Sequence, residues 1–140
     1  MPKSASHKII KSYETGFSTI EFWDNGIVFI NMQDNVEIDL DKSVRQFTIL
    51  NEHYNGKDRF KVLVEPGKFT YITPEGREFA AHPESNEMTA AIAVIIHSMA
   101  QRLIVNYLMY YLGKQKTKMK AFDTKQKAER WLLSYKPKKK

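Results

Sequence analysis

The fold is decided by four segments near the end of the chain, which read AAIAVII at residues 90–96, RLIVNYLMYYL at 102–112, MKAFD at 119–123 and AERWL at 128–132. The first segment is a short β-branched apolar run, typical of a buried strand. The second is apolar and long enough for a helix. The last two have the pattern of a short strand followed by an amphipathic helix. This order predicts a sheet that is covered by helices.

The N-terminal half supplies the other strands. Two β-forming segments, 19–23 and 27–31, flank an Asp-Asn-Gly turn at 24–26, and Asn and Gly tolerate the positive φ angles of a tight hairpin turn. We therefore expect a β-hairpin. Apolar residues at helical spacing then occupy 44–54, and a further strand follows at 60–64. A strand, a helix and a strand in this order predict a crossover connection and a partly parallel sheet.

Capping residues mark the helix starts. Asp39 or Asp41 can cap the helix at 44–54, because a side-chain carboxylate accepts the free N–H groups of the first turn. Capping explains this pair of acids more simply than acid–base chemistry does. Thr73 suits the cap of a second, short helix, and Pro74 suits its first position, where the missing N–H is no loss.

Length and composition predict one domain without cysteine chemistry. Of the 140 residues, we assign 17–135 to a single domain, 1–16 to a polar lead that is either flexible or an added edge strand, and 136–140 to a basic tail. The absence of cysteine excludes disulfides, thiolate metal ligands and a cysteine nucleophile. Residues 1–8 have no apolar signal core, so we expect a cytoplasmic protein.

The net charge of +6 is concentrated at one end. Residues 113–140 contain eleven lysines and arginines against two acids, a net charge of +9. Such an asymmetry indicates either polyanion binding or a solvated helix face with a solubilising terminus. The second interpretation is favoured, because no aromatic residue lies between the tail lysines to stack on bases. The apolar stretch 90–112 is interrupted by polar residues that include Arg102, which favours a strand and a helix over a membrane span.

Three parts of the sequence together resemble the small bacterial SpoIIAA-like proteins, relatives of the STAS domain, and most closely a STAS/SEC14-like branch of unknown function. These parts are the hairpin at 21–30; the strand at 62–64 with the segment TPEGREFA at 73–80; and the stretch 91–112 with KAFD at 120–123 and AERWL at 128–132. Order and spacing support the resemblance, which covers about residues 18–134; no single motif is diagnostic.

The resemblance implies an α/β fold: a mixed four- or five-stranded sheet with an N-terminal β-hairpin and with helices packed mainly on one face. STAS-type domains are usually not enzymes. They bind protein partners, and some bind nucleotides or lipophilic ligands. In anti-sigma-factor antagonists, a serine at the start of the helix after the central strand is phosphorylated. Thr73, or more loosely Thr70, matches that serine. A phosphate at a helix start would be favoured by free N–H groups, but the usual Asp-Ser-Gly run is absent here and Pro74 removes one N–H. Two alternatives therefore stay open for Thr73: a phosphoacceptor or a helix cap.

The helix near residues 99–112 is the best functional lead. Its apolar residues surround nearly the whole helix, whereas a helix on one face of a sheet needs only one apolar stripe. The surplus predicts either a partner or dimer surface, or a helix buried between the sheet and other helices. The residues expected on such a surface are Tyr107, Met109, Tyr110 and Tyr111.

A pocket between sheet and helices is the second lead. The residues expected to line it are Phe69, Tyr71, Phe79 and His97, with Tyr107 nearby. His97 follows a buried strand, at the sheet edge where α/β folds often bind ligands. The four histidines lack metal-ligand spacing, and the chain has no phosphate-binding glycine loop and no catalytic constellation. We therefore expect no enzyme activity, metal or cofactor.

Two functions are compatible with these features. The first is a cytoplasmic interaction or regulatory module that contacts a protein partner or a second copy of itself. The alternative is a carrier of a small apolar or lipid-like ligand between the sheet and the helices. A third possibility, nucleic-acid binding through the lysine-rich end, predicts strongly salt-dependent affinity.

Overall fold

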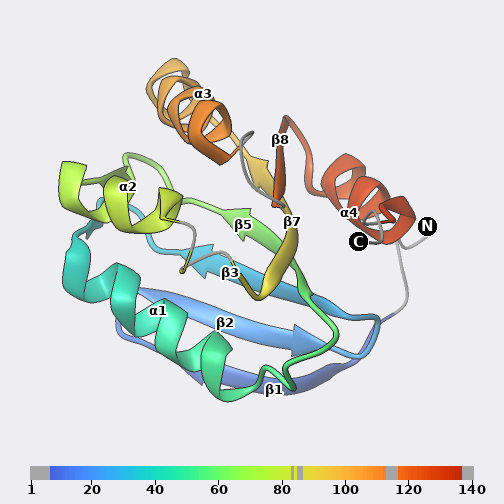
Figure 1. Cartoon of the computed structure of the whole chain (residues 1–140). Coiled ribbons are helices and arrows are strands. Elements are labelled where there is room, and N and C mark those ends of the chain that lie inside the picture. The colour runs from blue at the N-terminus through green and yellow to red at the C-terminus, as the bar shows by residue number, and fades with distance from the viewer. Residues whose placement is uncertain (1–6, 83, 85–86, 113–116, 137–140) are drawn as a thin grey trace.

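A computed structural model describes residues 7–82, 84, 87–112 and 117–136, without the side chains of 111 and 112. The elements are β1 (Ile9–Glu14), β2 (Ser18–Trp23), β3 (Ile27–Met32), β4 (Glu37–Ile38), α1 (Leu40–Glu52), β5 (Phe60–Glu65), β6 (Tyr71–Ile72), α2 (Pro74–Ala81), β7 (Thr89–Ile95), α3 (Met99–Leu112), β8 (Lys118–Phe122) and α4 (Lys125–Ser134). The chain is thus an α/β protein with the predicted N-terminal hairpin, β2–β3 (Figure 1).

The main sheet is mixed and has the strand order β1-β2-β3-β5-β7-β8. Strands β1, β2 and β3 pair antiparallel, whereas β3, β5, β7 and β8 run parallel to one another. Short strands β4 and β6 form a separate parallel pair. The predicted crossovers therefore exist, because each parallel pair is joined through a helix.

The sheet has six strands, where four or five were predicted. The added strand is β1, which lies within the N-terminal lead and pairs with β2, so residues 9–14 form the edge strand that was one of the two alternatives. Ile9 and Ile10 are both exposed, and the register shifts between Ile9 and Lys11. Pairing of β1 therefore rests on backbone hydrogen bonds more than on apolar burial. For this reason its sequence has no apolar alternation that would identify it as a strand.

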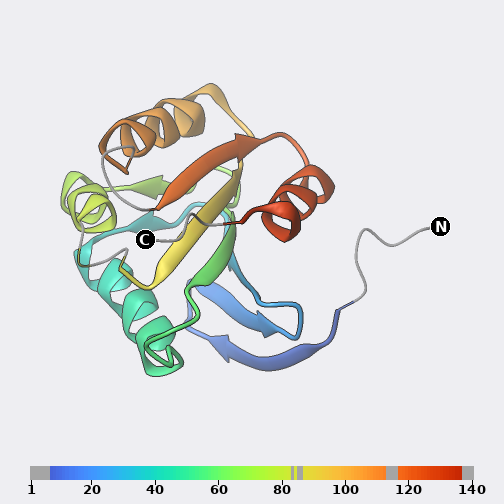
Figure 2. The same cartoon turned by 45° about the vertical axis from the view of Figure 1, so that its right-hand side comes forward.

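Three helices cover one face of the sheet and one helix covers the other (Figures 1 and 2). Leu50 of α1 belongs to a buried cluster with Phe22, Val28 and Val62 on the first face. Ala128 and Leu132 of α4 belong to a second cluster with Trp23 and other residues on the opposite face. Helices packed mainly on one face were predicted, and the structure confirms this arrangement.

Strand β3 shows how the sequence forms both clusters. Ile27 and Phe29 point toward α4, whereas Val28 and Ile30 point toward α1. Because successive side chains of a strand point to opposite faces, a strand covered on both faces must be apolar throughout. Together with its parallel neighbour β5, this strand forms the floor beneath α1, α2 and α3.

Candidate functional site

A cavity of about 230 Å³ lies between the sheet and helices α1, α2 and α3. Its floor is made by residues of three parallel strands that face these helices: Ile30, Met32, Val62, Val64, Ile92 and Val94. Its roof is made by apolar residues of the three helices: Phe47, Leu50, Phe79, Ala80, Ile104, Val105 and Leu108. The cavity is larger than an engineered apolar cavity of about 150 Å³ that binds benzene.

The described part of the cavity wall contains few polar side chains and no ionisable ones. Among the described residues that line it, the polar side chains belong to Ser43, Gln46, Thr70, Thr89 and Gln101, and none is an acid, a base or a histidine. An ion transferred into such a wall would lose its hydration without gaining a charged partner. The chemistry of the cavity is therefore the binding of apolar, uncharged groups.

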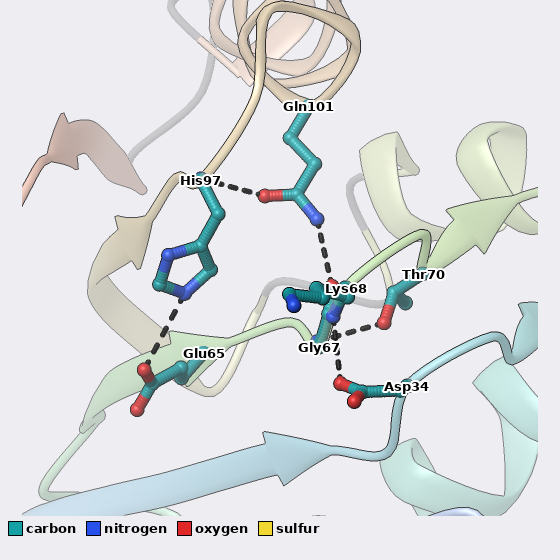
Figure 3. A network of polar contacts seen from close by, with 7 residues as sticks. All are labelled: Asp34, Glu65, Gly67, Lys68, Thr70, His97 and Gln101. Carbon is teal, nitrogen blue, oxygen red and sulfur yellow. Dashed lines mark hydrogen bonds and ion pairs between the residues drawn. The ribbon is translucent and has the colours of Figure 1, made fainter.

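A network of hydrogen bonds includes two residues of the cavity wall, Thr70 and Gln101 (Figure 3). The side-chain oxygen of Gln101 accepts from the backbone N–H of His97 over 2.8 Å, and its Nε2 donates to the carbonyl of Gly67 over 2.9 Å. Thr70 Oγ1 accepts from the Gly67 N–H over 2.7 Å and donates to the Gln33 carbonyl over 2.9 Å. Asp34 Oδ1 accepts from the N–H of Lys68. These bonds join the segments that follow β3, β5 and β7.

Gly67 allows this close packing of loops. A β-carbon at Gly67 would lie 2.5 Å from Asp34 Oδ1 and 2.7 Å from the Asp34 backbone nitrogen. Gly76 is crowded in the same way in the first turn of α2, where a β-carbon would lie 2.7 Å from the Ile38 carbonyl oxygen. The two glycines therefore set how closely the β5–β6 loop and α2 approach their neighbours.

Of the four predicted pocket residues, the cavity wall contains Phe79. Phe69 is 79% exposed and has a φ of 59°, and Tyr71 is 45% exposed, so both aromatic side chains face solvent. His97 does lie at the carboxyl end of β7, but its ring faces Glu65, with Nε2 at 3.4 Å from the carboxylate. The loop around Phe69 turns outward because the Lys68 N–H bonds back to Asp34 and the Thr70 hydroxyl bonds back to the Gln33 carbonyl.

Thr73 caps α2. Its side chain accepts the N–H of Gly76 over 3.1 Å, and Pro74 occupies the first turn, as predicted. Asp39 caps α1 in the same way by accepting the Lys42 N–H over 2.9 Å. This hydrogen bond, together with the nearby charge of Lys42, holds the pKa of Asp39 below its usual value. The helix-cap role of Thr73 is thus seen directly, and the phosphoacceptor role stays a prediction.

The outer face of α3 presents an apolar stripe. Its exposed members repeat every three or four residues and are Met99, Leu103, Tyr107 and Tyr110. Tyr107 and Tyr110 were predicted on such a surface, and Tyr107 lies beneath the guanidinium of Arg77. Met109 is half-buried, and the side chain of Tyr111 lies outside the described part. Met99 and Leu103 were not predicted, although their spacing of four residues was visible in the sequence.

The basic end of the chain packs partly on the second face of the sheet. Lys125 Nζ lies 4.3 Å from the centre of the Phe29 ring, and Lys127 pairs with Asp123 in the same helix region. Lys61 Nζ donates to the Tyr135 carbonyl, and burial lowers the pKa of Lys61. The tail lysines 138–140 lie outside the described residues, and the polyanion interpretation stays untested.

The cavity wall contains two buried glutamines that were not predicted from the sequence. Gln46 and Gln101 are 9% and 6% exposed. Each precedes a buried apolar residue by one helical turn, Leu50 and Val105 respectively, so each occupies a core position of its helix. A polar residue at such a position was the signal that could have identified them.

Within ranges 7–82, 87–112 and 117–136, no three histidines, aspartates or glutamates gather in a way that could hold a metal ion. In the same part of the chain, every helix falls short of the length and hydropathy that crossing a bilayer requires.

Comparison with known proteins identifies a family and a fold. A family model described as a domain of unknown function (DUF7793) matches residues 21–136. An uncharacterized protein of the DUF3478 family from Shewanella loihica PV-4, whose crystal structure has a SpoIIAA-like fold, superposes with a TM-score of 0.57 and 12% identity, over 94% of this chain and 99% of that one. Among curated proteins, none matches the chain. The superposition confirms the predicted SpoIIAA-like fold.

Proposed function

Since the chain belongs to the DUF7793 family, whose function its description leaves open, we propose that it is a non-enzymatic binding protein that holds a small apolar ligand between its sheet and helices α1, α2 and α3. The cavity of about 230 Å³ supports this proposal most directly. Its wall is almost entirely hydrocarbon, and binding sites for small molecules are concave and mostly apolar. The cytoplasmic location predicted from the sequence is part of the proposal.

The distribution of ionisable groups also favours binding over catalysis. Acid–base catalysis needs a titratable side chain within hydrogen-bond reach of the reacting group. The described residues of the cavity wall include no such side chain. Glu65 and His97 face each other, and neither is one of the residues that line the cavity. The wall can therefore select and desolvate a molecule, and it offers no group that would transform one.

Thermal unfolding with a panel of uncharged apolar molecules, from benzene to 1-octanol, tests the proposal. At a concentration ten times Kd, a ligand that binds only the folded state adds about 1.4 kcal/mol to the unfolding free energy. This stabilisation raises the Tm of a chain of this size by about 3–6 °C. The absence of a saturable shift with any member of the panel would contradict the proposal.

A pair of variants assigns the shift to the cavity. Val105→Phe adds volume to a buried wall residue of α3, whereas Leu103→Phe adds the same aromatic ring on the exposed side of the same helix. We expect the shift to persist in Leu103→Phe and to vanish in Val105→Phe. Circular dichroism establishes that both variants fold, and Val64→Phe on β5 provides a second way to fill the cavity.

The apolar stripe on α3 favours a second candidate function, contact with a second copy of the chain. Four large apolar side chains are exposed along one face of α3. Contiguous exposed apolar surface of this kind marks sites of contact between proteins. Light scattering after size-exclusion chromatography would then give twice the monomer mass of 16.4 kDa, and Leu103→Lys would restore the monomer. A wild-type protein that stays monomeric at high concentration would contradict self-association.

A further inference from the structure

The side-chain amide of Gln46 has its nitrogen turned toward Ser18, because Nε2 donates to Ser18 Oγ over 3.2 Å. Ser18 Oγ also lies 2.8 Å from Thr15 Oγ1, and either hydroxyl can be the donor of that contact. Thr15 Oγ1 in turn accepts from the Ser18 N–H over 2.9 Å.

Gln46 Oε1 is left as a hydrogen-bond acceptor without a donor among the described residues. Gln46 is 91% buried as a residue and is one of the residues that line the cavity. Gln101, the other buried glutamine of the wall, has both ends of its amide satisfied by backbone groups. An acceptor of the wall that has no protein donor is free to bond to a ligand, and a ligand that supplies a donor gains that hydrogen bond.

The other polar groups of the wall do not select between donors and acceptors. Ser43 and Thr89 present hydroxyls, each of which can rotate to donate or to accept. Thr70 already donates to the Gln33 carbonyl and accepts from the Gly67 N–H. Gln46 Oε1 is thus the wall group that favours a ligand with a donor, because a carbonyl oxygen can only accept.

The cavity volume sets how much of a ligand can be buried in it. An apolar cavity of about 150 Å³ holds benzene, which has six non-hydrogen atoms. In proportion, a cavity of about 230 Å³ holds about nine non-hydrogen atoms. A long-chain lipid would have to extend far beyond the cavity, whereas a medium-chain or monocyclic molecule fits inside it.

From these observations, and resting on the proposed function, we propose the chemical class of the ligand. It is an uncharged molecule of about nine non-hydrogen atoms, mostly hydrocarbon, with one O–H or N–H donor that bonds to Gln46 Oε1. Medium-chain alcohols and small alkylphenols belong to this class. A carboxylate of the same length does not, because the described wall has no cation to pair with it.

Three probes test each part of this class by titration calorimetry at neutral pH. 1-Octanol has the donor, its isomer heptyl methyl ether lacks it, and octanoate replaces it with a charge. We expect 1-octanol to bind about fivefold more tightly than the ether, the usual effect of one neutral hydrogen bond. We expect octanoate to bind at least about tenfold more weakly than 1-octanol.

Variants of Gln46 assign the preference to its oxygen. Gln46→Met keeps the length of the side chain and removes the acceptor, so the ratio between 1-octanol and the ether should fall to about one. Ser18→Ala removes the partner of Nε2 and keeps Oε1, so the ratio should persist. Gln126→Met, the same substitution at an exposed position of α4, should change neither affinity.

The outcomes separate this inference from the proposed function. Equal affinities of the wild-type protein for 1-octanol and its ether would overturn the donor requirement, and octanoate binding as tight as 1-octanol would overturn the requirement for an uncharged ligand. In both cases a small-molecule site would stand. Binding of none of the three probes, together with no shift from the wider panel of apolar molecules, would overturn the proposed function itself. The comparison of 1-octanol with heptyl methyl ether on the wild-type protein tests the donor requirement even if Gln46→Met fails to fold.

Discussion

The side-chain amide of Gln101, in the first turn of α3, donates a hydrogen bond of 2.9 Å to the carbonyl oxygen of Gly67, in the loop that follows β5. The oxygen of the same amide accepts from the His97 N–H, at the carboxyl end of β7. One buried side chain thus joins a helix, a loop and a strand end at the border of the cavity (Figure 3).

Replacement of Gln101 by Met should lower the free energy of unfolding by about 1–3 kcal/mol, because it leaves a backbone donor and a backbone acceptor without partners. Urea unfolding measures this change. Gln126→Met on the exposed face of α4 is the matched control, with an expected effect within about 0.5 kcal/mol. Equal stabilities of the two variants would show that the Gln101 hydrogen bonds contribute nothing to the fold.

Gly67→Ala should destabilise the protein by about 1–3 kcal/mol, the usual effect of forcing extra volume into a packed site. The added β-carbon would lie within 2.7 Å of backbone atoms of residues 33 and 34, as well as of the Asp34 carboxylate. The double variant with Asp34→Ala should therefore stay destabilised, because only the side-chain clash is relieved. Recovery of wild-type stability in the double variant, measured by urea unfolding, would contradict the backbone contact.

Thr73→Ala should lower the unfolding free energy by about 1 kcal/mol through loss of the α2 cap, and Thr73→Ser should retain most of the stability. Thr124 caps α4 by the same contact, from its hydroxyl to the Lys127 N–H, so Thr124→Ala is the matched comparison. Thermal and urea unfolding measure both effects. A Thr73→Ala protein as stable as wild type would indicate that the cap is not important to the fold.

The lowered pKa of Asp39 predicts that the protein loses stability in acid. The Lys42 N–H that its carboxylate accepts, and the Lys42 charge, lower its pKa in the folded state. A lowered pKa contributes stability above the ordinary aspartate value of about 3.9, and this contribution disappears as pH falls through the folded-state pKa. Asp39→Asn keeps a good cap without a titrating group. Urea unfolding at a series of pH values, from neutral to below the pKa of Asp39, should therefore show a shallower decline of the unfolding free energy for the variant. Parallel profiles for the variant and the wild type would contradict a contribution of Asp39 to this decline.

The sequence predicted the elements whose burial leaves a periodic pattern. The Asn-Gly turn fixed the β2–β3 hairpin, and the apolar runs of β5 and β7 separated by helices implied the parallel sheet. Strand β1 stayed ambiguous because most of its residues are exposed, so no alternation marks it. Helix α3 looked apolar all round, and only tertiary packing distinguishes buried Val105 from exposed Leu103.

The candidate site was less predictable than the fold. A cavity is the volume that side chains from separate elements leave unfilled, and no local pattern encodes that volume. Phe69 and Tyr71 were expected in it, yet Phe69 in the loop before β6 and Tyr71 at the start of β6 are both exposed. Gln46 could have been noticed, since it interrupts the apolar face of α1 next to Phe47 and one turn before Leu50.

The most direct test of the central claim, that the space beneath α1, α2 and α3 binds a small uncharged ligand, is a titration of the methyl-labelled protein with 1-octanol, followed by NMR at its methionines. Met32 and Met119 line the cavity, whereas Met99 is exposed on α3. The account predicts saturable shifts of the Met32 and Met119 methyl signals and an unchanged Met99 signal. Unchanged signals of Met32 and Met119 at saturating 1-octanol, or a response confined to Met99, would contradict it.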